Sequence, residues 1–136
     1  MNRFKMLIIE DSDIRELYEI LFRERFDVTT ASCGSEAMRV IDDSDNFDIC
    51  IADIIMPVEA AGLDPEETGV RVLHHLASSG KCKRVVVISV NTGVEEKIAS
   101  LLPHDVAFVF RSKNDVSPDE IVSHVDDLMT QKKEQT

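Results

Sequence analysis

The sequence lacks any apolar run close to the roughly 20 residues that a membrane-spanning helix needs. The first ten residues reach an acid, Glu10, after a short apolar stretch, without the small-residue cleavage site that ends a signal peptide. No internal repeat and no low-complexity segment occurs in the chain. From these absences we expect neither a membrane span nor a secretory leader, and a cytoplasmic location.

Basic residues are few, with 15 Lys and Arg against 26 Asp and Glu, which gives a net charge of −11 at pH 7. Proteins that bind DNA or RNA usually present a basic face that neutralises phosphates. The only basic clusters are short, Lys81, Lys83 and Arg84, then Lys132 and Lys133. The charge balance therefore argues against nucleic acid as a partner, whereas divalent metals and basic proteins suit an acidic chain.

Cysteine is also scarce, and its spacing excludes the usual cysteine-based sites. The three cysteines, Cys33, Cys50 and Cys82, are odd in number, form no C-x-x-C pair and have no zinc spacing with histidine. We expect them to be reduced and structural or incidental. His104 and His124 are expected to be lone and exposed.

The 136 residues fit one domain, which we expect to span residues 1–130, followed by a frayed polar tail at 131–136. Dense, β-branched apolar runs without polar alternation are typical of strands buried on both faces of a parallel sheet. A fifth run alternates partly, as an edge strand does. The dense runs are residues 6–9, 49–52, 85–90 and 106–110, and the edge run is 27–31.

Helical patterns lie between these strands, with apolar residues at three- and four-residue steps. The first such stripe comprises Ile14, Leu17, Tyr18, Leu21 and Phe22. Capping boxes are predicted at 92–95 and 117–120. Five β-α units indicate an α/β fold of the flavodoxin-like (βα)5 type, a doubly wound five-stranded parallel sheet with strand order 2-1-3-4-5.

Polar side chains follow four of the predicted strands at the carboxyl edge of this sheet, where ligands bind in such folds. They are Glu10 and Asp11, Asp53, Ser89 and Lys113. Converging carboxylates repel one another, and a hard divalent ion such as Mg²⁺ relieves that repulsion. A carboxylate can act as a nucleophile and form an aspartyl phosphate, which a metal ion, a lysine and a hydroxyl would stabilise. Any one of these residues could equally be a helix cap or a surface side chain.

The chain resembles the receiver domain of two-component response regulators, with the chemotaxis-regulator-like fold, over nearly its whole length. The resemblance rests on four motifs taken in order, Ile8-Ile9-Glu10-Asp11, Asp53-Ile54-Ile55-Met56-Pro57, Val87-Ile88-Ser89 and Phe110-Arg111-Ser112-Lys113. It implies a phosphoprotein that acts in signal transduction through a His-Asp phosphorelay. A sensor histidine kinase or phosphotransfer protein would supply the phosphoryl group, and an unknown downstream protein would bind the product.

The resemblance also implies a role for individual residues. Asp53 resembles the phosphoacceptor, Ser89 the hydroxyl that moves toward the phosphate, and Lys113 the lysine that binds it. Phe110 resembles the switch aromatic, which turns inward and changes the surface of the fourth helix, fifth strand and fifth helix. The metal ligands, for Mg²⁺ or Mn²⁺, would be Glu10, Asp11, Asp53 and the backbone carbonyl of Ile55.

Several positions depart from the family pattern. Glu10 is longer than the usual Asp and is expected to hold the metal through water. Val90 replaces a small residue and would crowd the phosphate, while Ile55 offers no polar side chain to orient a water, so slow hydrolysis is expected. Lys113-Asn114 replaces Lys-Pro, which predicts either a trans bond with a rearranged loop or a strained cis bond.

The largest departure is the longer segment from Val58 to Thr68, before Gly69. Within it, Asp64-Pro65-Glu66-Glu67 has the composition of a helix start, so the third helix is expected to begin early or a separate turn to form. The segment would lie beside Asp53 and either gate access, select a partner or be a tolerated surface insertion.

Two other functions stay open at the level of sequence. A pseudo-receiver would be a non-phosphorylated interaction module, which the missing proline, Val90 and the insertion favour. A phosphatase of the haloacid-dehalogenase type would use Asp11-Ser12-Asp13, although Arg15 stands where such enzymes have threonine. The receiver interpretation predicts no enzyme, only limited self-phosphotransfer and autodephosphorylation.

Overall fold

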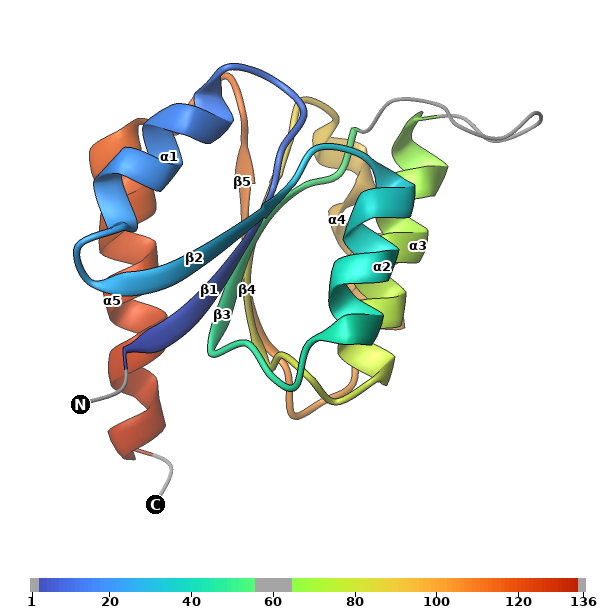
Figure 1. The fold of residues 1–136 in the computed structure, drawn as a ribbon. Coiled ribbons are helices and arrows are strands. Elements are labelled where there is room, and N and C mark those ends of the chain that lie inside the picture. The colour runs from blue at the N-terminus through green and yellow to red at the C-terminus, as the bar shows by residue number, and fades with distance from the viewer. Residues whose placement is uncertain (1–2, 56–64, 135–136) are drawn as a thin grey trace.

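The structure is a computed structural model, which describes residues 3–55 and 65–134. One parallel sheet of five strands runs through the molecule in the order β2-β1-β3-β4-β5. Helices α1 and α5 cover one face, and α2, α3 and α4 cover the other (Figure 1). The predicted doubly wound α/β fold and its strand order are confirmed.

The strands form where the apolar runs predicted them. Every residue of β3 is buried, whereas buried and exposed residues alternate in part along β2, as expected of an edge strand. The fourth strand ends at Ser89, as the placement of Ser89 at the strand edge predicted, and Val90, the last residue of the apolar run, lies outside it and is 51% exposed. The strands are β1 (Phe4–Ile9), β2 (Phe26–Ala31), β3 (Ile49–Asp53), β4 (Arg84–Ser89) and β5 (Ala107–Ser112).

The helices pack on two separate apolar layers, one on each face of the sheet. Successive residues of β1 point to opposite faces, so Met6 and Ile8 join one layer while Leu7 and Ile9 join the other. The helices are α1 (Ile14–Phe22), α2 (Gly34–Asp43), α3 (Pro65–Ser78), α4 (Glu95–Leu101) and α5 (Pro118–Glu134), with a 3-10 turn, η1, at Thr92–Val94.

The stripe of α1 is narrower than predicted. Tyr18 and Phe22 are buried, and Ile14 and Leu21 pack against the same layer, but Leu17 is 39% exposed. Leu17 lies at the side of α1 and not on the helix face that packs against the sheet. Its predicted place in the buried stripe of α1 is therefore wrong.

One predicted capping box is confirmed and the other is not. The Ser117 N–H donates to Glu120 Oε1 at 3.1 Å, and the Glu120 N–H donates to Ser117 Oγ at 3.2 Å. At the other position the chain first forms the turn η1, and α4 begins only at Glu95. The Gly93 N–H there donates to Asn91 Oδ1 at 3.0 Å, so a side chain before the predicted box supports a turn instead of a helix start.

The third helix begins early, at Pro65, as one of the two alternatives predicted. Residues 56–64, which include most of the 58–68 insertion and the Met56-Pro57 part of the second motif, lie outside the described residues. Helix α5 continues to Glu134, past the expected domain limit at residue 130. Among the described residues no peptide bond is cis, so the Lys113–Asn114 bond is trans.

Candidate phosphoacceptor site

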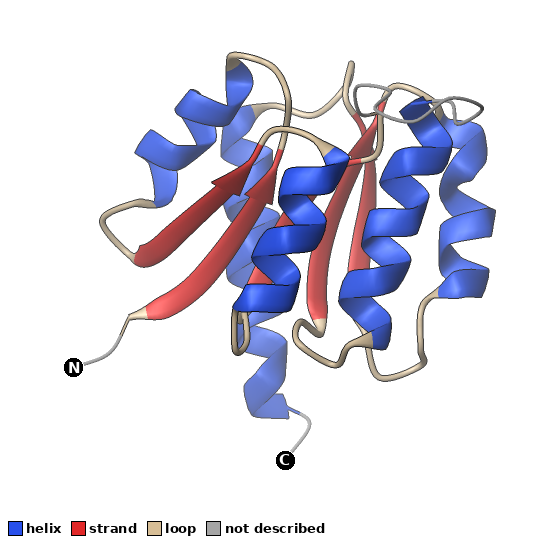
Figure 2. Ribbon diagram, turned by 45° about the vertical axis from the view of Figure 1, so that its right-hand side comes forward, coloured by secondary structure: helices blue, strands red, loops and turns tan. Residues whose placement is uncertain are grey.

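The strands of the sheet end at one edge, where they turn into loops (Figure 2). Three carboxylates converge there. One oxygen each of Glu10, Asp11 and Asp53 lies within 4.8 Å of the others. Glu10 and Asp53 are only 2% exposed, whereas Asp11 is exposed. The parallel strands β1 and β3 are neighbours, so their ends bring together residues that are far apart in the sequence.

Lys113 supplies the positive charge of this site. Its Nζ donates to Asp53 Oδ2 at 2.7 Å and to Glu10 Oε1 at 3.1 Å. Burial acts to lower the pKa of Lys113, but the hydrogen bond and charge of Asp53, together with those of Glu10, outweigh it and raise that pKa. Lys113 is therefore held as a cation between the two buried carboxylates.

One carboxylate oxygen of Glu10 is buried and makes no hydrogen bond to the described residues. Its Oε1 accepts from Lys113 and from the Ser12 hydroxyl, at 2.9 Å, whereas its buried Oε2 has no hydrogen-bond partner among the residues that the structure describes. A buried carboxylate oxygen without a partner is costly unless a cation or a donor reaches it. Together with Asp11 and Asp53 it makes an all-oxygen donor set, which fits a hard divalent ion such as Mg²⁺.

Backbone N–H groups form hydrogen bonds that order the ends of β3 and β4, where Ile55 and Ser89 lie. The Ile55 N–H donates to Asp53 Oδ1 at 3.0 Å, and the Ile54 N–H donates to the Ile88 carbonyl at 3.1 Å. Ser89, which follows Ile88 and is fully buried, accepts the Asn91 N–H at its Oγ, at 3.1 Å. Because that contact uses a lone pair of Oγ, the hydroxyl hydrogen of Ser89 remains a donor. The metal role of the Ile55 carbonyl stays a prediction.

The remaining predicted positions surround this centre. Phe110 on β5 is half-buried and packs against the layer that contains Leu7 and Ile9, and its switch role stays a prediction. Val90, which follows the end of β4, is exposed to solvent.

Tyr18, predicted to be a packing residue, is buried beneath the site. Burial raises its pKa most, and the charges of Glu10 and Asp53 add to that shift while Lys113 opposes it. Tyr18 is thus a neutral, packed phenol that lies within electrostatic reach of the carboxylates.

The cysteines and His124 have no part in the centre. All three cysteines are free, and burial raises the pKa of Cys50 well above its usual value and that of Cys82 to about 11. Neither thiol is a nucleophile near neutral pH. His124 is not lone as predicted, because its Nε2 lies 2.8 Å from an Arg111 nitrogen.

One contact at this edge is not predictable from the sequence. Asn91 binds Glu66 through its side chain, from Nδ2 to Oε2 at 2.7 Å. An Asn that precedes a turn is a recognisable signal, but its partner lies 25 residues away and only the fold reveals it.

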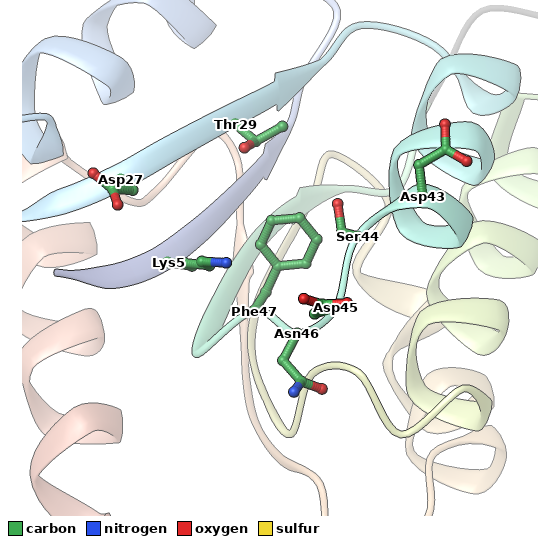
Figure 3. A pocket seen from close by; sticks show the side chains of 8 residues that line it. All are labelled: Lys5, Asp27, Thr29, Asp43, Ser44, Asp45, Asn46 and Phe47. Atoms are coloured by element: carbon green, nitrogen blue, oxygen red, sulfur yellow. The ribbon is translucent and has the colours of Figure 1, made fainter. Parts of the chain in front are cut away.

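A hollow of about 290 Å³ lies at the opposite edge of the sheet (Figure 3). It is bounded by the starts of β1 and β2 and by the segment that joins α2 to β3. Its lining residues are Lys5, Asp27, Thr29, Asp43, Ser44, Asp45, Asn46 and Phe47. None of the predicted site residues is among them, so the carboxylate centre and this hollow are separate.

Comparison with known proteins supports the resemblance. The chain matches no family model. Over 61 residues it is 41% identical to the response regulator SaeR of Staphylococcus epidermidis, a match that covers 43% of this chain and 25% of that protein. The chain thus spans about a quarter of the length of the curated relative it matches.

Solved structures match over nearly the full chain. The Francisella response regulator 1452 receiver domain is 26% identical with a TM-score of 0.71, over 96% of this chain and 99% of that one. Response regulator TrrA of Thermotoga maritima, in complex with Mg²⁺-BeF, is 26% identical with a TM-score of 0.64, over 94% and 99%. A CheY-like receiver domain protein of Methanospirillum hungatei is 16% identical with a TM-score of 0.72, over 99% and 100%, and supports the fold alone.

The chain therefore has the fold of a CheY-like receiver domain. Its predicted resemblance to the receiver domains of two-component response regulators is confirmed. Within the described residues, no helix is long and apolar enough to cross a membrane.

Proposed function

We propose that this chain is a phosphoacceptor receiver domain, in which Asp53 takes a phosphoryl group from a sensor histidine kinase or phosphotransfer protein in the cytoplasm. The observation that carries the proposal is the contact of Lys113 Nζ with Asp53 Oδ2, at 2.7 Å, inside a cluster of three carboxylates. Asp53 is a buried acid that is paired with a lysine and lies next to oxygen atoms suited to a divalent metal ion. This arrangement suits phosphoryl transfer better than it suits a helix cap.

Asp53, Lys113 and Ser89 have different roles in this reaction. A carboxylate oxygen of Asp53 attacks the phosphorus, and the donor group leaves on the opposite side. Lys113 neutralises charge on one phosphoryl oxygen, and the free hydroxyl hydrogen of Ser89 is donated to another. A divalent ion, Mg²⁺ or Mn²⁺, held by Glu10, Asp11, Asp53 and the Ile55 carbonyl, would supply further positive charge.

Glu10 Oε2, which has no hydrogen-bond partner in the described part of the chain, supports a direct contact with the ion instead of the water-mediated one expected from the length of Glu10. Ile55 has no polar side chain that could orient an attacking water, which supports a slowly hydrolysing phosphoryl form and no enzymatic turnover. Phosphorylation would then move Ser89 and Phe110 and change the α4-β5-α5 face for a downstream protein.

The test is the intact mass of the chain after incubation with acetyl phosphate, with and without Mg²⁺, beside an Asp53→Asn variant. The proposal predicts a gain of one phosphoryl group that requires Mg²⁺ and is absent from the variant. No gain in the wild-type protein would instead favour the pseudo-receiver interpretation.

A haloacid-dehalogenase-type phosphatase is less well supported by the site. That mechanism needs Asp11 as the nucleophile, but Asp11 is exposed, and the hydrogen bonds of Lys113 go to Asp53 and Glu10. Steady release of phosphate from a small phosphomonoester, lost in Asp11→Asn and kept in Asp53→Asn, would favour it.

A further inference from the structure

Asn91 connects the end of β4 to the first turn of α3. Its N–H donates to Ser89 Oγ at 3.1 Å, and its side-chain Nδ2 donates to Glu66 Oε2 at 2.7 Å. Its Oδ1 accepts the Gly93 N–H at 3.0 Å, within the turn η1. One residue therefore links the hydroxyl of Ser89, the start of α3 and the loop that leads to α4.

The N-terminal part of α3 packs closely against the residue that follows Asp53. Glu66 is its second residue, and Gly69 lies in the same region of the helix. A Cβ at Gly69 would overlap the carbonyl group of Ile54, so the helix backbone lies directly against the residue that follows Asp53. Glu66 thus lies about one helical turn before a close contact between α3 and the end of β3, and it binds the loop from there.

The loop itself is less restrained than the helix. Val90, Asn91 and Gly93 are exposed, whereas Ser89 is fixed in the sheet, where its carbonyl accepts the Lys113 N–H at 2.9 Å. A movement of the Ser89 side chain must disturb the Asn91 N–H that binds it. The Glu66 hydrogen bond opposes that disturbance, because it holds the other end of the same residue.

We propose that the Glu66–Asn91 hydrogen bond is a latch that positions Ser89 and holds the β4–α4 loop in its unphosphorylated arrangement. This inference rests on the proposed function, in which Ser89 moves toward a phosphoryl group on Asp53. Glu66 and Asn91 are positioning residues, since they act through Ser89. The early start of α3, at Pro65 within the lengthened segment 58–68, brings Glu66 to this position and couples α3 to the hydroxyl.

Three substitutions distinguish an effect of the Glu66–Asn91 hydrogen bond from an effect of the negative charge of Glu66. Glu66→Ala removes the acceptor, whereas Glu66→Gln keeps an acceptor oxygen and removes the charge. Glu96→Ala is the matched control, since it removes an exposed acid from the first turn of α4. Should Glu66→Ala not fold, Asn91→Asp removes the donor from the other side and keeps an oxygen for the Gly93 N–H.

Two measurements on the full chain report on the latch. The first is the hydrogen-exchange rate of the Asn91 and Gly93 amides without phosphodonor, and the second is the rate of phosphorylation by acetyl phosphate with Mg²⁺. Loss of one hydrogen bond changes the equilibrium between the restrained and the released arrangement of the β4–α4 loop about three- to tenfold. Both rates should rise by that factor in Glu66→Ala and stay within about twofold of wild type in Glu66→Gln and Glu96→Ala.

Each other result overturns the latch. Unchanged rates in Glu66→Ala would show that the bond restrains nothing, and slower phosphorylation would show that it assists the reaction. Equal changes in all three variants would assign the effect to charge. If the wild-type protein accepts no phosphoryl group, the proposed function fails and this inference fails with it; if only the variants fail to differ, the proposed function stands.

Discussion

Gly69 is the residue at which α3 approaches the end of β3. Any side chain there would overlap the carbonyl of Ile54, so the first turn of α3 must retreat from β3. We expect Gly69→Ala to lower the free energy of unfolding by about 2–3 kcal/mol, as for other overpacked sites. Urea unfolding followed by circular dichroism measures this change.

The matched control for Gly69→Ala is Gly93→Ala. Among the described residues, a Cβ at Gly93 would meet a single side-chain atom, Asn91 Oδ1 at 3.3 Å, and a shift of a few tenths of an ångström relieves that contact. The stability of Gly93→Ala should therefore stay near that of wild type. Equal losses in both variants would mean that the tight approach at Gly69 is not what limits the packing of α3.

The charge of Lys113 leads to a second prediction for a single residue, which concerns the pH dependence of stability. Its pKa is raised in the folded chain above the unfolded value of 10.5, mainly because Asp53 and Glu10 outweigh the effect of burial. A group whose pKa is raised on folding stabilises the fold below its unfolded pKa, and that contribution is lost as pH rises through the folded value.

The stability that Lys113 contributes, measured against Lys113→Met in metal-free buffer, should thus be constant up to about pH 10 and shrink above it. Urea unfolding at a series of pH values measures the difference between the two proteins. A difference that stays constant well above pH 10.5 would show that Lys113 is not held by the two carboxylates.

Among the elements, α5 has the most completely defined start. Ser117 and Glu120 exchange hydrogen bonds with each other's N–H groups, so the two side chains satisfy two donors that the helix leaves free. Ser117→Ala should lower the free energy of unfolding by about 1 kcal/mol. Thermal or urea unfolding detects the loss, and Ser123→Ala, an exposed position within the same helix, should show almost none.

Local patterns predicted the elements well where one interaction dominates. The strands follow from dense β-branched runs, and the start of α5 from Ser117-Pro-Asp-Glu120, because both depend on near neighbours in the sequence. The predicted start of α4 is wrong, since Asn91 stabilises the turn η1 at Thr92–Val94 and α4 begins only at Glu95. The exposure of Leu17 was also missed, because it depends on how α1 is rotated against the sheet.

In the whole molecule, the sheet topology assembles the site. Because five parallel strands end at one edge, Glu10, Asp53 and Lys113 meet although they are distant in the sequence. That convergence was predictable from the strand ends. The orphan oxygen of Glu10 and the Glu66–Asn91 contact were not, since both depend on side-chain geometry that only the packed fold defines.

The most direct test of the account is the identity of the residue that carries the phosphoryl group. After reaction with acetyl phosphate and Mg²⁺, borohydride reduces an aspartyl phosphate to homoserine, and peptide mass spectrometry locates the change. The expected result is reduction at Asp53 alone. Reduction at Asp11, or at no aspartate while phosphate is bound elsewhere, would contradict it.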